Sequence, residues 1–194
     1  MRIIGIDPSL TATGIATIDT NHPDHITCKT IQTKPYGKTI YDRINRIKHI
    51  RRHITEAIYT TNAECIVIEA PSYGSQGAGT WERAGLWWLA VNAVIDQDWG
   101  ILVEVPPATR ARYATGRGNA AKDVVMISTV RRYPTADITN NNEADAVILA
   151  AIGARLAGHP IDDPLPMANQ TALTKLPRLT DAALPHVRDA EPSR

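Results

Sequence analysis

Two short runs rich in β-branched residues, 2–7 and 13–18, are separated by only five residues at the start of the chain. This spacing predicts a β-hairpin. A third run, 26–33, extends the hairpin, and beyond residue 34 strand patterns alternate with helix patterns. Three hairpin-connected strands followed by this alternation predict an α/β domain with a mixed sheet and helices packed on it.

The segments after residue 34 complete the expected sheet. From Lys38 to Tyr59, isoleucines recur at spacings of three and four, which predicts an amphipathic helix with its basic residues outward. Further helices are expected at about 80–99, 108–114, 120–132 and 142–156, and strands at 65–68 and 101–105. The sheet therefore has five strands. Residues 159–194 contain six prolines and no long apolar stripe, so we expect a domain of residues 1–158 and a tail with little independent structure.

The 194-residue chain has a net charge of only +1, but its charges are unevenly distributed. Eight Lys or Arg residues and two acids lie between Lys29 and Glu56, and six bases with one acid lie between Val105 and Tyr133. Two basic blocks in a neutral protein are typical of a phosphate-binding surface, although solvated helix faces give the same pattern.

The composition excludes several classes of protein. The longest apolar runs are far too short to span a membrane, and the first residues lack a signal-peptide pattern. Two cysteines, Cys28 and Cys65, are too few for a disulfide scaffold and have no zinc-ligand partners nearby. We therefore expect reduced thiols and a cytoplasmic protein without a membrane partner.

Three acidic residues border segments of buried type. Asp7 ends the first strand, Glu69 ends the fourth, and Asp145 directly precedes the apolar run of the last helix. A lone acid at a strand end is usually solvated, and an ionised carboxylate beside a core is costly unless a cation compensates it. Three acids that converge on one sheet edge supply the hard oxygen ligands of Mg²⁺. Two such ions can activate a water and stabilise the leaving oxygen of a phosphodiester.

Four motifs follow one another through residues 2–157: Gly5-Ile6-Asp7-Pro8-Ser9 with Thr13-Gly14, then Ile68-Glu69, then Thr115-Gly116-Arg117-Gly118-Asn119-Ala120-Ala121-Lys122, then Glu143-Ala144-Asp145-Ala146. Together they resemble the RuvC family of Holliday-junction resolvases. The resemblance implies a ribonuclease H-like fold and phosphodiester hydrolysis with two Mg²⁺ ions per site, for which Mn²⁺ can substitute. It also implies a homodimer that acts on four-way DNA junctions, in the cytoplasm of a bacterial or phage-infected cell.

One position departs from the family pattern. The family usually has an acid or a histidine three residues before the final aspartate, and this chain has Asn142 there. Its amide oxygen can bind Mg²⁺ but is neutral and a weaker ligand. Glu143 is adjacent, but it points about 200° from Asp145 on a helix, and Asn140 to Glu143 fits an N-terminal capping box. Asn142 and Glu143 both stay candidates for completing the catalytic site.

Residues that contact DNA are expected first in the loop 71–79 and the helix start that follows it. The candidates there are Tyr73, Gln76 and Arg83. Tyr73 or Trp81 can stack on an unpaired base. Trp87 and its neighbour Trp88 are instead expected to be core or dimer-contact residues.

A second group of candidates for DNA contacts consists of Arg110, Arg117 and Lys122. Arg110 and Lys122 match basic positions of the family. Lys122 follows a glycine-containing loop and opens a helix, where backbone N–H groups, the helix dipole and the ammonium group can meet one phosphate. A plain turn is the alternative explanation of this loop.

The expected activity is therefore that of a Mg²⁺-dependent endonuclease that resolves Holliday junctions or other branched DNA. Three alternatives stay open. The chain can be a nuclease of relaxed specificity that cuts flaps and forks, or a DNA-binding relative without catalytic activity. A small ATPase-like domain is a third, but the chain is too short for the usual two-lobed form.

Overall fold

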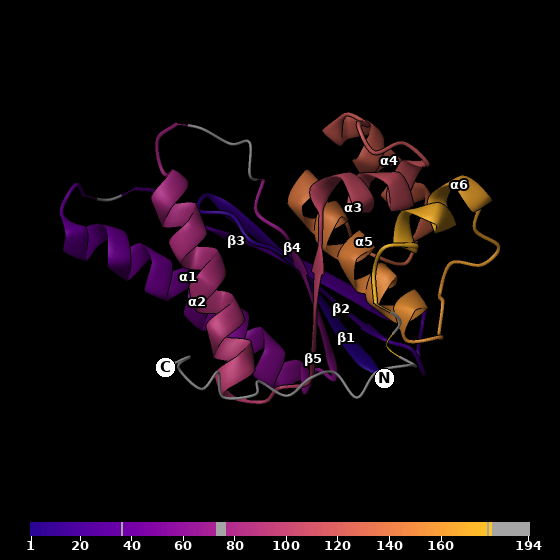
Figure 1. The fold of residues 1–194 in the computed structure, drawn as a ribbon, viewed down its shortest axis with the longest axis horizontal. Coiled ribbons are helices and arrows are strands. Elements are labelled where there is room, and N and C mark those ends of the chain that lie inside the picture. The colour runs from indigo at the N-terminus through magenta and orange to yellow at the C-terminus, as the bar shows by residue number, and fades with distance from the viewer. Residues whose placement is uncertain (36, 73–76, 178, 180–194) are drawn as a thin grey trace, which may run out of the picture.

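The sheet has five strands and mixed directions, as the sequence predicts (Figure 1). The computed structural model describes residues 1–35, 37–72, 77–177 and 179. The strands are β1 (Arg2–Asp7), β2 (Ala12–Asp19), β3 (Ile26–Gln32), β4 (Cys65–Glu69) and β5 (Ile101–Val105). Their order across the sheet is β3-β2-β1-β4-β5. The β1–β2 and β2–β3 pairs are antiparallel, whereas β4 runs parallel to both β1 and β5.

Helices cover both faces of the sheet (Figure 1). They are α1 (Ile40–Thr61), α2 (Thr80–Asp96), α3 (Pro107–Thr115), α4 (Lys122–Arg132), α5 (Asn141–Leu156) and α6 (Met167–Gln170), followed by a 3₁₀ turn (Thr171–Leu173). The first two pack on one face, and α5 packs on the other beneath α3 and α4. The five longer helices lie within a few residues of their predicted bounds. None of the helices in the described part of the chain is long and apolar enough to cross a membrane.

Helix α1 forms where local sequence signals agree. Thr39 caps its first turn by accepting from the N–H of Asp42, and the Asp42 carboxylate accepts from the Thr39 N–H in return. The isoleucine stripe then faces the sheet, with Ile50 and Ile54 fully buried. The helix ends at Asn62, which adopts a left-handed conformation with φ of 49°.

Helix α5 passes so close to the sheet that glycine is required beneath it. A Cβ atom at Gly5 of β1 would collide with the backbone of Ala146, and one at Gly14 of β2 would collide with the backbone of Asn142. Because of this close approach, almost all of α5 from Glu143 onward is buried. The packing also brings the first turns of α5 to the end of β1.

The core continues beyond residue 158, where proline content predicts a tail with little independent structure. The Asp162 carboxylate is fully buried and accepts from the phenol O–H groups of Tyr113 (2.9 Å) and Tyr133 (2.7 Å). It also accepts from the guanidinium of Arg155 at 2.7 Å. These contacts attach the segment to α3, α4 and α5, and three of its side chains join the core: Leu165, Ala172 and Leu179.

Both cysteines are free thiols. Cys65 lies in the core, and Cys28 is half-buried and donates to the carbonyl of Asp137 at 3.3 Å. Burial raises the pKa of Cys28 to about 11 and that of Cys65 to about 12. Both thiols are therefore protonated and weakly nucleophilic at neutral pH.

Candidate active site

The carboxyl ends of β1 and β4 meet at one edge of the sheet, because these strands are parallel neighbours. Asp7 ends β1 and Glu69 ends β4, and the charge of Glu69 is close enough to raise the pKa of Asp7. Asp145, in the second turn of α5, is close enough to raise the pKa of Asp7 by its charge. Asp7 and Asp145 are only 9% and 5% exposed. The structure thus brings the three sequence-predicted acids together in one largely buried cluster.

The positive charge near the acid cluster does not balance the negative charges of its three carboxylates. Burial raises the pKa of Asp7 well above its ordinary value, and the nearby charges of Glu69 and Asp145 raise it further. Burial also raises the pKa of Asp145 to about 6, although the charge of Arg110 opposes the rise. Three ionised carboxylates are therefore unfavourable here unless a further cation is present.

Arg110 of α3 lies inside the acid cluster. Its Nε donates to Glu69 Oε1 at 2.5 Å, and its Nη1 donates to Asp145 Oδ1. The residue is 8% exposed. The sequence predicts a contact between Arg110 and a DNA phosphate, but the structure pairs its guanidinium with two carboxylates and shields it from solvent. The physical reason is the charge of the cluster, which stabilises the nearest cation.

The three carboxylates are suitable ligands for a hard divalent cation, but two of them pair with the guanidinium of Arg110. Among the residues that the structure describes, no three acidic, histidine or cysteine side chains converge closely enough to hold a metal ion as they lie. We attribute this to Arg110, which separates Glu69 from Asp145. The carboxylates and their unbalanced charge fit Mg²⁺ once Arg110 moves away.

The residues before Asp145 form the cap of α5. Asn140 Oδ1 accepts from the N–H groups of Asn142 (3.0 Å) and Glu143 (3.1 Å), which confirms Asn140 as the N-cap. The Glu143 carboxylate accepts from the N–H (2.8 Å) and hydroxyl (2.7 Å) of Thr139 and from the Thr30 hydroxyl (2.9 Å). Burial raises the pKa of Glu143, but these hydrogen bonds outweigh it and the pKa lies below its ordinary value. Glu143 therefore has a structural role that accounts for its burial.

Asn141 is a residue that sequence reasoning missed. Its Oδ1 is buried and accepts no hydrogen bond from any described residue. It lies four residues before Asp145, on the same helical face, and the half-buried Asn142 lies three residues before it. An unpaired buried carbonyl is costly, by about 1–3 kcal/mol, unless something binds it. The only sequence signal was the run of three asparagines that opens α5.

Lys122 and Arg117 lie at and just before the start of α4. Lys122 is the exposed first residue of α4, whose N-cap, Ala121, provides no side-chain cap. Burial, Arg110 and Glu69 have larger effects on the pKa of Asp145, and the charge of Lys122 also lowers it. Arg117, in the preceding loop, is exposed. The charge of Lys122 therefore reaches the acid cluster from the start of a helix, where backbone N–H groups can bind an anion.

The candidates around α2 have different environments. Tyr73 and Gln76 lie outside the described residues. Arg83 is exposed, and its guanidinium donates to the Ala78 carbonyl (3.1 Å) and the Thr80 hydroxyl (3.0 Å) at the start of α2.

The tryptophans of α2 differ in their burial. Trp87 is buried and donates from Nε1 to the backbone carbonyl of Glu69 at 2.9 Å, which confirms it as a core residue. Its hydrogen bond helps fix the end of β4. Trp81 and Trp88 are 88% and 64% exposed, so neither belongs to the core of this chain.

No protein-family model and no curated protein sequence matches the chain. Solved structures do match. The structure of RuvC from Thermus thermophilus superposes with a TM-score of 0.62 at 17% identity, covering 82% of this chain and 98% of that one. RuvC from the same organism in complex with a Holliday junction substrate gives a TM-score of 0.59 at 16% identity, covering 77% and 90%. The chain therefore has the ribonuclease H-like fold of RuvC.

Proposed function

We propose that the chain is a Mg²⁺-dependent endonuclease that cuts branched DNA, in particular four-way junctions. The observation that supports this most is the buried cluster of Asp7, Glu69 and Asp145 at one sheet edge. Buried like charges are unfavourable for folding, so their convergence points to a bound cation and to chemistry. The fold supports the proposal because one of the similar structures is that of RuvC in complex with a Holliday junction substrate.

Asp7, Glu69 and Asp145 would hold two Mg²⁺ ions, for which Mn²⁺ can substitute, and Asn142 or Asn141 would add a neutral oxygen. When bound, the ions make a water more acidic and stabilise the departing 3′ oxygen. The protein positions the scissile phosphate. Lys122 and the free N–H groups at the start of α4 would bind that phosphate beside the acids.

Arg110 has a separate part in this proposal. Its guanidinium lies between Glu69 and Asp145 and offsets their charges. It must leave at least one of these carboxylates when divalent cations bind.

A homodimer is part of the proposal, because α2 presents an apolar stripe to solvent. Trp81, Trp88 and Ile95 recur every seven residues and are 88%, 64% and 44% exposed. Residues at this spacing share one helical face. A second copy of α2 packed on this stripe would cover it, and two acid clusters in one dimer suit a four-way junction with two strands to cut.

The test is cleavage of labelled four-way junction, flap and linear duplex in Mg²⁺ and in EDTA. The proposal expects Mg²⁺-dependent nicking of the junction in preference to the duplex. Equal cleavage of flaps would favour the nuclease of relaxed specificity. Junction binding without any cleavage would favour the non-catalytic relative, an alternative that the pairing of Arg110 with two acids makes worth testing.

A further inference from the structure

Helix α1 carries basic residues that nothing in the described structure pairs. Lys48, Arg51 and Arg52 form a row on the helix, which we call the α1 basic row. Lys48 and Arg52 are exposed and Arg51 is half-buried. None of the three forms an ion pair with a described residue. The two acids of α1 contact other residues: Asp42 caps Thr39, and Glu56 lies 3.5 Å from His53 Nδ1.

The α1 basic row is unfavourable for folding. Lys48 lies three and four residues before Arg51 and Arg52, the spacings at which side chains on a helix are neighbours and like charges repel. The helix macrodipole favours cations only in the last turn, and α1 has no basic residue there. Neither an ion pair nor the helix dipole offsets the charge of the row, so this charge is available to an anion outside the chain.

The α1 basic row begins close to the edge of the sheet that carries the acids. Strand β3 ends at Gln32 beside Ala12, at the same edge as Asp7. Arg46 of α1 donates from its guanidinium to the Leu10 carbonyl at 2.5 Å, in the loop that follows Asp7. The first half of α1 is thereby attached to the end of β1.

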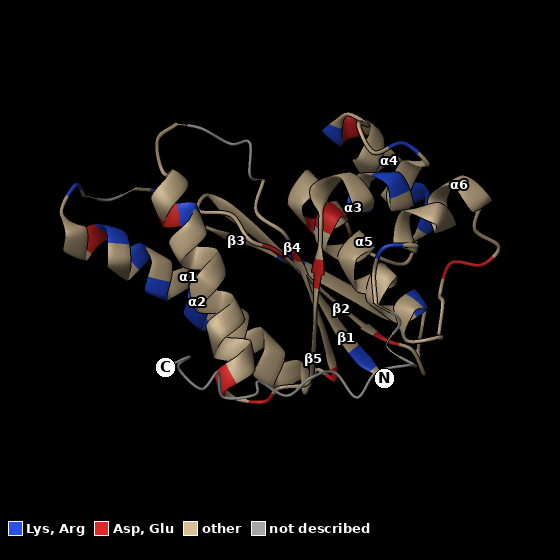
Figure 2. Ribbon diagram, viewed as in Figure 1, with Lys and Arg blue, Asp and Glu red and all other residues tan. Residues whose placement is uncertain are grey.

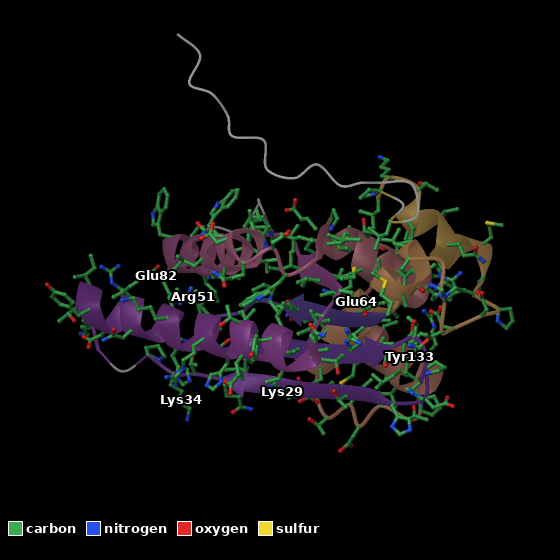
Figure 3. The ribbon with its side chains drawn as sticks, turned by 90° about the horizontal axis from the view of Figure 1, so that it is seen from below. Lys29, Lys34, Arg51, Glu64, Glu82 and Tyr133 are labelled. Carbon is green, nitrogen blue, oxygen red and sulfur yellow. The ribbon has the colours of Figure 1, made fainter. Side chains whose placement is uncertain are left out.

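The row then leads away from this edge. Arg52 lies six residues, or about 9 Å, further along the helix axis than Arg46. Figure 2 shows basic segments repeating along α1 from its start to its middle. Figure 3 shows Lys34, from the segment that joins β3 to α1, beside the same helix.

We propose that the α1 basic row, with Lys34, binds the sugar–phosphate backbone of a duplex DNA arm. The arm would pass along α1 as it leaves the sheet edge that carries the acid cluster. This inference rests on the proposed function, and it adds a DNA-binding surface separate from Lys122 and the start of α4. Phosphates fit the row because the contacts need only charge and reach. The one aromatic side chain between Lys48 and Arg52 is His49, whose ring packs edge-to-face on that of His53 with a centroid distance of 4.6 Å. The row therefore has no tyrosine or tryptophan for the stacking on which single strands depend.

The experiment uses the full chain in EDTA, so that binding is measured without cleavage. The test variant is the double substitution Lys48→Gln with Arg52→Gln. The matched control is Arg2→Gln with Lys175→Gln, which also removes two positive charges. Arg2 lies at the end of β1 opposite to Asp7, and Lys175 is exposed and follows α6. Anisotropy gives the affinity for a labelled four-way junction, a linear duplex and a single strand over a series of salt concentrations.

The test variant should lower the slope of log K against log salt by about 0.9 per lost contact, or about 1.8 in all. The loss should be equal for the junction and the duplex, because the contact is to an arm. The control should superimpose on wild type, and the charge-preserving pair Lys48→Arg with Arg52→Lys should retain the wild-type slope. Thermal melting at low salt should show the test variant at least as stable as wild type, since it removes repulsion.

If wild type binds and cuts junctions but the test variant has the wild-type salt slope, this inference is wrong and the proposed function is not affected. A loss confined to the junction, or to the single strand, would overturn the duplex arm as its ligand. If wild type binds DNA but does not cut it, the proposed nuclease function is wrong. A lower salt slope of the test variant would then still support DNA binding by the α1 basic row. A wild type that binds no DNA would overturn both.

Discussion

Replacing Asp145 by asparagine should abolish cleavage and yet stabilise the metal-free protein at neutral pH. Burial raises the pKa of Asp145 from its ordinary 3.8 to about 6, despite the opposing charge of Arg110. The native state therefore binds a proton more tightly than the unfolded chain. The stability that this proton contributes is present below pH 3.8 and is lost as the pH rises through about 6.

The size of the effect follows from the two pKa values. At pH 7 the ionised Asp145 costs the native state about 3 kcal/mol, and at pH 4 only about 0.5 kcal/mol. An asparagine side chain at this position would be nearly isosteric and uncharged, and Arg110 would keep its contact with Glu69. Asp145→Asn should therefore raise the free energy of unfolding by up to about 3 kcal/mol at pH 7 and by little at pH 4.

Urea denaturation of both proteins in EDTA, at pH 4 and pH 7, measures this difference. Asp163→Asn is the control, since Asp163 is 54% exposed and lies in an ion pair outside the acid cluster. Added Mg²⁺ should stabilise wild type more than the Asp145 variant, because binding to the native state stabilises it. A variant less stable than wild type at pH 7, or a gain equal at both pH values, would refute this account of the cluster.

Four further substitutions test other parts of the structure. Asp162→Asn should lower the free energy of unfolding by about 3 kcal/mol, because it removes the fully buried carboxylate that pairs with Arg155, whereas the exposed Asp163→Asn should cost at most about 1 kcal/mol in the same urea assay. Glu143→Gln should cost about 1–2 kcal/mol in thermal melts and retain cleavage, and an inactive variant of unchanged stability would instead make Glu143 a metal ligand. Lys122→Ala should weaken binding to all DNA sequences and lower the salt slope by about 1, so superimposed slopes would contradict the phosphate contact. Asn141→Leu should stabilise the metal-free protein but weaken Mg²⁺ binding in calorimetry, and unchanged Mg²⁺ affinity would exclude it as a ligand.

Much of the fold could be predicted because its signals are local. The isoleucine spacing predicts helix α1, and the β-branched runs predict the strands. The hairpin, followed by alternating strands and helices, predicts a mixed sheet. The meeting of Asp7 and Glu69 also followed, because parallel neighbouring strands end at the same edge. Asp145 could be singled out as an acid beside an apolar run, but its distance from the other two depends on how closely α5 approaches Gly5 and Gly14.

Other features depend on contacts between distant segments and carry no local signal. Arg110 lies among the acids because α3 packs beside α5, which no periodicity around residue 110 indicates. Asp162 finds its partners on three helices, so a proline-rich composition concealed a packed segment. The unpaired oxygen of Asn141 could be recognised only once the neighbours of α5 were known.

The most direct test of the central claim is single-turnover cleavage of a labelled four-way junction in Mg²⁺ by wild type and by Asp7→Asn, Glu69→Gln and Asp145→Asn, with junction binding measured in parallel. The account predicts that wild type nicks the junction and that each variant binds it at least as tightly but does not cut, because each removes charge that holds the metal and no contact to DNA. Mg²⁺-dependent cleavage that survives in any of the three variants would contradict the assignment of that carboxylate. A folded wild type that binds the junction but leaves it uncut in both Mg²⁺ and Mn²⁺ would contradict the claim that the acid cluster is a nuclease site.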